Sequence, residues 1–192
     1  MTLLRATAPA TLPLSLAEVK AHLRVDFADD DSLIGGLLAA AVAYVDGTGV
    51  LGRAMITQDW AQWVNQSPGR VRLEMGPFQS LVSVQYYDAD GVLQTATLAD
   101  FETWLSHDHV ICKPKDDHEW PNADTRPDAI KITYRAGFGD DAADVPQTIK
   151  QAMLMLIAHW YERRESASED RLVTVPFGFE SLMSVERVSW YG

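Results

Sequence analysis

Apolar residues recur at the spacing of an α-helix in three segments of the chain, at residues 15–24, 32–47 and 146–164. This periodicity predicts a helix in each segment. Ser15 precedes the first apolar stripe and Glu18 follows three residues later, which is the arrangement of a capping box. The second segment ends in Asp-Gly-Thr-Gly, a typical C-terminal stop.

The middle of the chain, at about residues 55–135, changes to an alternation of apolar and polar residues. The segments VRLEM, LVSVQYY and AIKITYR have the period of two that half-buried strands show. The turn sequence DADG, followed by VLQTA, predicts a hairpin. The expected fold class is therefore α+β: a small helical bundle of two N-terminal helices and one long C-terminal helix, with a β-rich insertion and a C-terminal arm.

The second helical segment contains two glycines in its interior, Gly35 and Gly36. Each lowers helix stability by about 1 kcal/mol relative to alanine. A glycine at such a position allows the close approach of another backbone.

The long helical segment, PQTIKQAMLMLIAHWYERR, is apolar on nearly every side. A helix of this kind is buried on nearly every side, so we expect a neighbouring chain to cover its second face. Its charged end is either an ordinary helix terminus or a salt-bridging contact between subunits. The candidate interface residues on this helix are Met155, Trp160, Arg163 and Arg164.

The sequence predicts a single domain over residues 1–164, followed by a linker and a C-terminal arm at residues 165–192. The arm is rich in apolar and aromatic residues and follows a polar stretch, which is typical of a segment that docks on another surface. The alternative is that it folds back onto its own core. The candidate docking residues are Phe177, Phe179, Leu182, Met183, Val188, Trp190 and Tyr191.

The sequence YRAGFGDDAADVP joins the last predicted strand to the long helix. Its two glycines could mark a phosphate-binding turn, but three aspartates follow them and no lysine comes before Lys150. Phosphate sites use backbone N–H groups together with cationic side chains. We therefore interpret this segment as a tight turn and helix start.

The chain of 192 residues carries 27 acidic and 16 basic residues, a formal net charge of −11. This balance argues against a surface that grips nucleic acid. The single cysteine, Cys112, excludes an intrachain disulfide and a thiolate zinc cluster. No apolar run reaches the roughly 18–20 residues that span a bilayer, and the N-terminus lacks the pattern of a signal peptide, so we expect a soluble protein without a membrane partner.

The best constellation for an active site is HDHVICKPKDDHE, from His107 to Glu119. Its imidazole and carboxylate groups are potential metal ligands or acid–base groups. Its spacing matches no recognised zinc motif, and the acidic part lies in a loop bordered by proline. We expect no catalytic residue, metal or cofactor, and keep a small acidic metal-dependent enzyme as an alternative.

The chain resembles the head–tail connector (adaptor, head-completion) proteins of long-tailed phages, prophages and gene transfer agents. The resemblance lies in LSLAEVKAHLRVDFADDDSLIGGLLAAAVAYVD, in the β-rich segment, in ITYRAGFGDDAADVPQTIKQAMLMLIAHWYERRE and in the aromatic tail. The turn Tyr-x-x-Gly-Phe-Gly, the Val-Pro helix start and the ending Tyr-Glu-x-Arg-Glu are its most specific parts. The tail ends in VERVSWYG, which departs from the arginine-rich ending that is commoner in the family.

The resemblance implies a structural virion protein at the head–tail junction, assembled in the bacterial cytoplasm. Its connector domain would form a ring, of twelve copies as in the family, that binds the portal and continues the DNA channel. Double-stranded DNA would pass through without specific binding, and the next head–tail or tail-terminator protein would dock on the ring. A neck or tail-completion protein elsewhere in the tail tube is the alternative within the virion.

Overall fold

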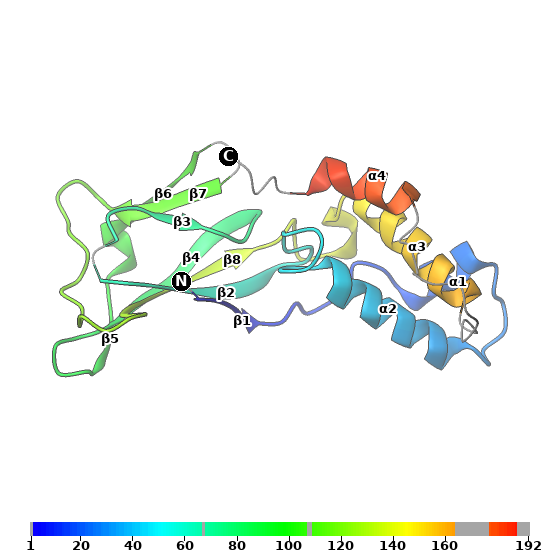
Figure 1. Cartoon of the computed structure of the whole chain (residues 1–192), viewed down its shortest axis with the longest axis horizontal. Coiled ribbons are helices and arrows are strands. Elements are labelled where there is room, and N and C mark those ends of the chain that lie inside the picture. Colours follow the sequence, from blue (N-terminus) through cyan, green and yellow to red (C-terminus); the bar gives the residue numbers. More distant parts are fainter. Residues whose placement is uncertain (1, 67, 107–108, 164–176, 188–192) are drawn as a thin grey trace. The chain divides into compact units, whose positions relative to one another are not determined.

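The computed structural model describes residues 2–66, 68–106, 109–163 and 177–187. Helices and antiparallel sheets occur together in it, which confirms the predicted α+β fold class (Figure 1).

The chain divides into two compact units, each with its own buried side chains. The β unit comprises Met1–Ala10 and Thr57–Gly137, and the helical unit comprises Thr11–Ile56 and Phe138–Gly192. The sequence predicts one connector domain with a β-rich insertion, and the insertion is what forms most of the β unit.

The larger sheet of the β unit has five antiparallel strands in the order β1-β2-β8-β4-β5 (Figure 1). Its central strands β2 and β8 are buried along most of their length, whereas the edge strands β1 and β5 are mainly exposed. The predicted hairpin joins β4 to β5 through the turn at Asp88–Gly91. The strands are β1 (Thr2–Thr7), β2 (Gln58–Val64), β4 (Phe78–Tyr87), β5 (Leu93–Thr95) and β8 (Ile130–Ala136).

The smaller sheet has three antiparallel strands in the order β3-β7-β6. A short 3-10 turn, η1 (Leu98–Asp100), leads into β6. The strands are β3 (Val71–Leu73), β6 (Phe101–Ser106) and β7 (His109–Pro114).

The N-terminal lead, for which the sequence analysis expects no element, forms β1. It pairs with β2, and the Arg5 guanidinium lies 5.3 Å from the ring centroid of Trp60, its cross-strand partner. An edge strand gains its order from this pairing with a distant segment, so its own short sequence predicts it poorly.

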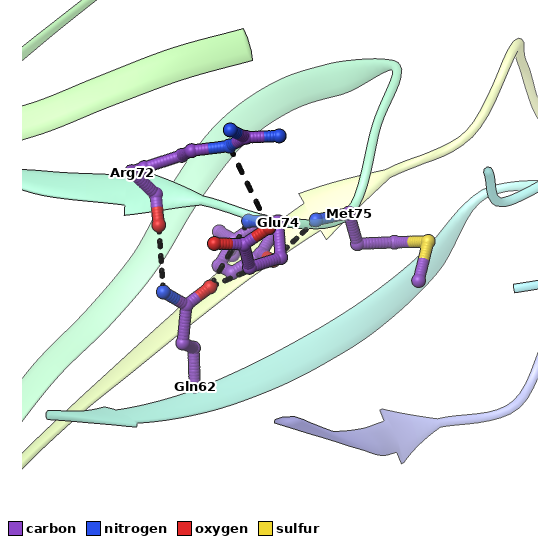
Figure 2. A network of polar contacts seen from close by, with 5 residues as sticks. Gln62, Arg72, Glu74 and Met75 are labelled. Atoms are coloured by element: carbon purple, nitrogen blue, oxygen red, sulfur yellow. Dashed lines mark hydrogen bonds and ion pairs between the residues drawn. The ribbon is translucent and has the colours of Figure 1, made fainter. Parts of the chain in front are cut away.

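A buried polar network joins the two sheets (Figure 2). The Gln62 side chain on β2 donates to the Arg72 carbonyl at 2.7 Å and accepts the Glu74 N–H at 3.1 Å. The Tyr134 hydroxyl on β8 accepts the Met75 N–H at 2.9 Å and donates to Gln62 Oε1 at 3.3 Å. Gln62 and Tyr134 are fully buried, so these bonds replace lost water contacts and fix β3 over the larger sheet.

The helical unit contains the three predicted helices, with ends that differ from prediction by one or two residues. The Ser15 hydroxyl accepts the Glu18 N–H at 3.2 Å and the Glu18 carboxylate accepts the Ser15 N–H at 2.7 Å, so the predicted capping box is present. The elements are α1 (Leu16–Leu23), α2 (Asp31–Val45), the 3-10 turn η2 (Ala142–Asp144), α3 (Gln147–Glu162) and α4 (Phe177–Glu186).

Helix α3 packs against α1, α2 and α4, and its apolar residues form the centre of one core (Figure 1). Phe179 and Met183 of α4 belong to that core and are fully buried. A helix of the same chain therefore covers part of the second apolar face of α3, with Met155 against Gly178 of α4. Leu154 and Ala158 of that face are half-buried, and their cover by a neighbouring chain stays a prediction.

Candidate functional site

The predicted docking residues of the arm separate into two groups on α4. Phe179 and Met183 point into the core, and Leu182 packs partly buried against it, so these three side chains hold α4 on its own chain. Phe177 points outward and is 86% exposed. Val185 of the same helix, which was not among the predicted residues, also points outward and is 74% exposed. The three core residues therefore fold back onto their own chain, as the alternative predicted. A partner can reach only the outer face of α4 among the described residues of this helix.

The predicted interface residues of α3 lie at its boundary with other helices. Met155 packs under Gly178, where a Cβ would come within 2.3 Å of the Met155 methyl group. The Trp160 ring stands edge-on to Tyr44 of α2 at 6.2 Å between centroids. Arg163 is exposed and caps the helix C-terminus. Four predicted residues lie outside the described part of the chain: Arg164, Val188, Trp190 and Tyr191.

A second exposed surface lies on α2, the helix that contains Gly35 and Gly36. Ile34, Leu38, Ala41 and Val45 are buried, as the periodicity predicts. The opposite side of the helix is exposed yet uncharged, and we call it the α2 face. Its residues, spaced at i, i+3, i+7, i+10 and i+11, are Leu33, Gly36, Ala40, Ala43 and Tyr44.

The sequence does carry a signal for the α2 face. No charged residue occurs between Ser32 and Val45. A helix at a protein surface normally presents charged and polar residues to solvent. The absence of charge along this stretch therefore indicates that the outer side of the helix contacts another surface and not solvent.

A third exposed apolar region is the outer end of the β6–β7 hairpin in the β unit. Leu105 is 72% exposed, and Trp104 beside it is partly covered by the Lys113 ammonium at 5.8 Å from the ring centroid. Lys113 also pairs with Glu102 at 3.1 Å, further along the hairpin, so a charged pair lies beside the Trp104 ring.

The glycine turn before α3 is a structural connector, as the sequence predicts. Gly137 has φ of 146°, and a Cβ on Gly139 would lie 2.1 Å from Asp144 Oδ2. The Asp144 carboxylate accepts the Asp141 N–H at 3.0 Å in a capping box. A carboxylate thus lies where a phosphate group would have to bind. Lys150, behind the turn, donates to the Ala142 carbonyl at 3.3 Å.

The region proposed for an alternative enzyme lines an open cleft of about 410 Å³ around Lys113–Asp116 and His118–Trp120. Two of its polar side chains lie beside carboxylates: Lys113 Nζ is 2.8 Å from Asp116 Oδ1, and His118 Nδ1 is 3.9 Å from Asp100 Oδ1. The hydrogen bond from Lys113 holds the pKa of the exposed Asp116 carboxyl below its ordinary value. Within the described ranges, no three His, Cys, Asp or Glu residues are grouped as a metal site requires.

Cys112 on β7 is an inert strand residue. It is fully buried, and burial raises the pKa of its thiol to about 12. A thiol reacts as the thiolate, so this side chain is not an activated nucleophile. His109 lies on the same strand, whereas His107 lies outside the described residues. Across the helices that the structure describes, none has the length and apolar character needed to cross a bilayer.

Comparisons with known proteins agree with one another. A family model described as "HCP: Head completion protein" matches residues 13–173. The fold is similar to a chain in the virion of a native gene transfer agent (GTA) particle, with a TM-score of 0.79 and 23% identity. It is also similar to chains in the neck of an empty GTA particle computed with C6 symmetry (TM-score 0.77, 23% identity) and of a native GTA particle computed with C12 symmetry (0.71, 21%). Each similarity covers 98% of this chain and 96% of the other. No curated protein sequence matches the chain significantly.

Proposed function

We propose that this chain, which belongs to the head completion protein family, is a structural protein that joins the head to the tail in a phage-like particle. The observation that carries the proposal is the likeness in fold to chains of GTA virions and necks along 98% of this chain. That likeness extends over both units, so it supports a shared architecture and a shared place in the particle.

The protein acts as a ring of identical copies, with twelve as the number that the C12 symmetry of a similar neck supports. Copies in a closed ring contact each other head to tail, through two different surfaces on each copy. The exposed outer faces of α2 and α4 supply two such surfaces within the helical unit.

The ring continues the channel through which double-stranded DNA leaves the head. The formal charge of −11 on each copy suits this role, because an acidic wall repels the phosphate backbone and does not hold it. DNA therefore passes without specific binding.

The portal of the head is the partner on one side of the ring, and the next head–tail or tail-terminator protein is the partner on the other. The tail segment from Phe177 to Tyr191 docks on the portal or on an adjacent subunit. The exposed Phe177 side chain supports this role, because a phenyl ring that is 86% exposed gains free energy when a partner covers it.

The deciding experiment is native mass spectrometry of the full chain alone and mixed with the portal protein of the same particle. A ring-sized complex that contains both proteins supports the connector role. Rings without portal binding favour the second candidate, a neck or tail-completion protein placed elsewhere along the tube, which the likeness to neck chains also supports. Folded proteins that form neither ring nor complex at any concentration or salt overturn both.

A further inference from the structure

We infer that the α2 face receives the outer face of α4 from a neighbouring copy of this chain. The inference rests on the proposed ring and names the pair of surfaces that closes it. Both surfaces belong to the helical unit and are exposed in a single copy.

The first argument concerns charge. Each copy carries a formal charge of −11, so identical copies repel one another over most of their surface. The α2 face has no charged residue from Ser32 to Val45. Two copies can therefore approach there without burying an unpaired charge and without like-charge contact.

The second argument concerns Gly36, which lies on the α2 face between Leu33 and Ala40. A Cβ built at this position meets no atom of the described chain within 4 Å, so nothing inside one copy requires a glycine there. Glycine weakens an exposed helix relative to alanine. A second helix backbone that packs closely over Gly36 explains why a glycine is present.

The third argument concerns the fit of α4. Its outward residues Phe177, Ser181, Ser184 and Val185 lie at i, i+4, i+7 and i+8, which is one stripe of the helix. These four residues are uncharged, with small serines between two large apolar ends, and the exposed Glu180 lies along one side of them. It spans about 12 Å, against about 16 Å from Leu33 to Tyr44 on α2, at 1.5 Å of rise per residue. Small residues thus face small residues, and Phe177 and Val185 cover the ends of the α2 face.

The pair also satisfies the symmetry of a ring. The α2 face and the outer face of α4 are different surfaces, so their contact is heterologous and every copy keeps one of each free for the next neighbour. A contact of α2 with α2 would give a closed dimer instead.

The test is crosslinking of the full chain that carries Ala40→Cys and Ser181→Cys together, at the centres of the two stripes. Cys112 is buried and does not compete for the reagent. With a short bismaleimide we expect a ladder of covalent multimers on a denaturing gel. Each single variant is the control, and neither should give multimers beyond a dimer.

The outcomes separate this inference from the proposed function. Rings by native mass spectrometry together with a ladder support both. Rings of the double variant without a ladder overturn the α2–α4 pair and leave the ring in place. A protein that never assembles, alone or with the portal, overturns the ring and this inference with it.

Gly36→Ala and Gly35→Ala form a matched pair for a second test. Gly35 lies off the exposed stripe, and a Cβ there also meets no atom within 4 Å. Both substitutions should raise the thermal unfolding temperature of the unassembled chain, because alanine favours the helix. Only Gly36→Ala should weaken assembly, on the order of tenfold or more, because its methyl group lies between the two helices. Equal assembly of the two variants overturns the inference.

Discussion

The Tyr134 hydroxyl illustrates how single polar atoms hold the β unit together. It lies in a fully buried site, bonded to Met75 N and to Gln62 Oε1. Tyr134→Phe leaves the Met75 amide without its acceptor and without water, so the free energy of unfolding should fall by about 1–3 kcal/mol. Denaturant unfolding followed by tryptophan fluorescence measures this loss.

The matched control for this change is Tyr86→Phe, at a half-buried position on β4. It removes the same hydroxyl group where solvent reaches the ring, and we expect the free energy of unfolding to fall by less than about 0.5 kcal/mol. Losses of equal size in the two variants would show that the buried network does not stabilise the sheets.

Gly139 depends on a close approach and not on an unusual φ. A Cβ at this residue would lie 2.1 Å from Oδ2 and 2.5 Å from Cβ of Asp144. Gly139→Ala should therefore displace the Asp144 carboxylate from the Asp141 N–H, with a loss of about 1–2 kcal/mol as for other helix caps. Thermal unfolding of this variant should occur at a lower temperature than that of Gly35→Ala, and the reverse order would contradict the capping role.

At the scale of elements, Glu18 links α1 to α3. Its carboxylate accepts bonds from Ser15 and lies 3.5 Å from the Lys150 ammonium. The bonds from Ser15, together with Lys150, hold the pKa of Glu18 below its ordinary value of 4.5. A lowered folded-state pKa stabilises the protein above the unfolded-state pKa, and the effect is lost as pH falls through the folded-state pKa.

Glu18→Gln keeps the shape of the capping box and removes the charge. We expect it to lower the free energy of unfolding by about 0.5 kcal/mol at pH 7, a small value because solvent screens a side chain that is 46% exposed. The difference from the unchanged protein should shrink as the pH falls below the ordinary pKa of 4.5 and vanish once the pH lies below the lowered folded-state pKa. Urea unfolding at several pH values tests this, with Glu180→Gln on the exposed side of α4 as the control; a difference that persists at low pH would contradict the assignment.

The helices could be predicted because their signals are local. The spacing of apolar residues and the Ser15–Glu18 box both lie within one or two turns. Strand β1 and the packing of α4 could not be predicted, because each depends on a partner far away in the chain. In β1, Arg5 pairs with Trp60, and in α4, Phe179 packs into the core around α3. The same limit explains the expectation of a neighbouring chain on α3, since periodicity shows that a face is buried and not what buries it.

At the scale of the whole molecule, the family predicted from the sequence is confirmed by the match over residues 13–173. The segments that carry the resemblance lie in both units: the helices belong to the helical unit, whereas the β-rich segment and the glycine turn up to Gly137 belong to the β unit. The candidate surfaces were harder to predict. Phe177 was identified from its aromatic context. The run without charge from Ser32 to Val45 is a signal for the α2 face, and the structure adds which side of that helix is covered.

The two-unit organisation decides how a truncation of the tail has to be interpreted. Removal of all residues after Arg163 deletes α4, and with it Phe179 and Met183 from the helical core. We expect a loss of at least about 3 kcal/mol in the stability of that unit, comparable to the removal of a buried phenylalanine. Removal of residues after Arg187 keeps Phe179 and Met183 in the chain, so we expect this second truncated protein to retain the helix content of the helical unit.

Cys112 provides a reporter that separates the two units in this experiment. Its thiol is buried in the β unit, so it should stay unreactive toward a thiol reagent at pH 8 in both truncated proteins, while circular dichroism records the loss of helix only in the shorter one. If Cys112 reacts as soon as α4 is lost, the units do not fold separately. Loss of portal binding then counts as evidence for docking only in the protein that ends at Arg187, since that protein keeps Phe179 and Met183 of the helical core.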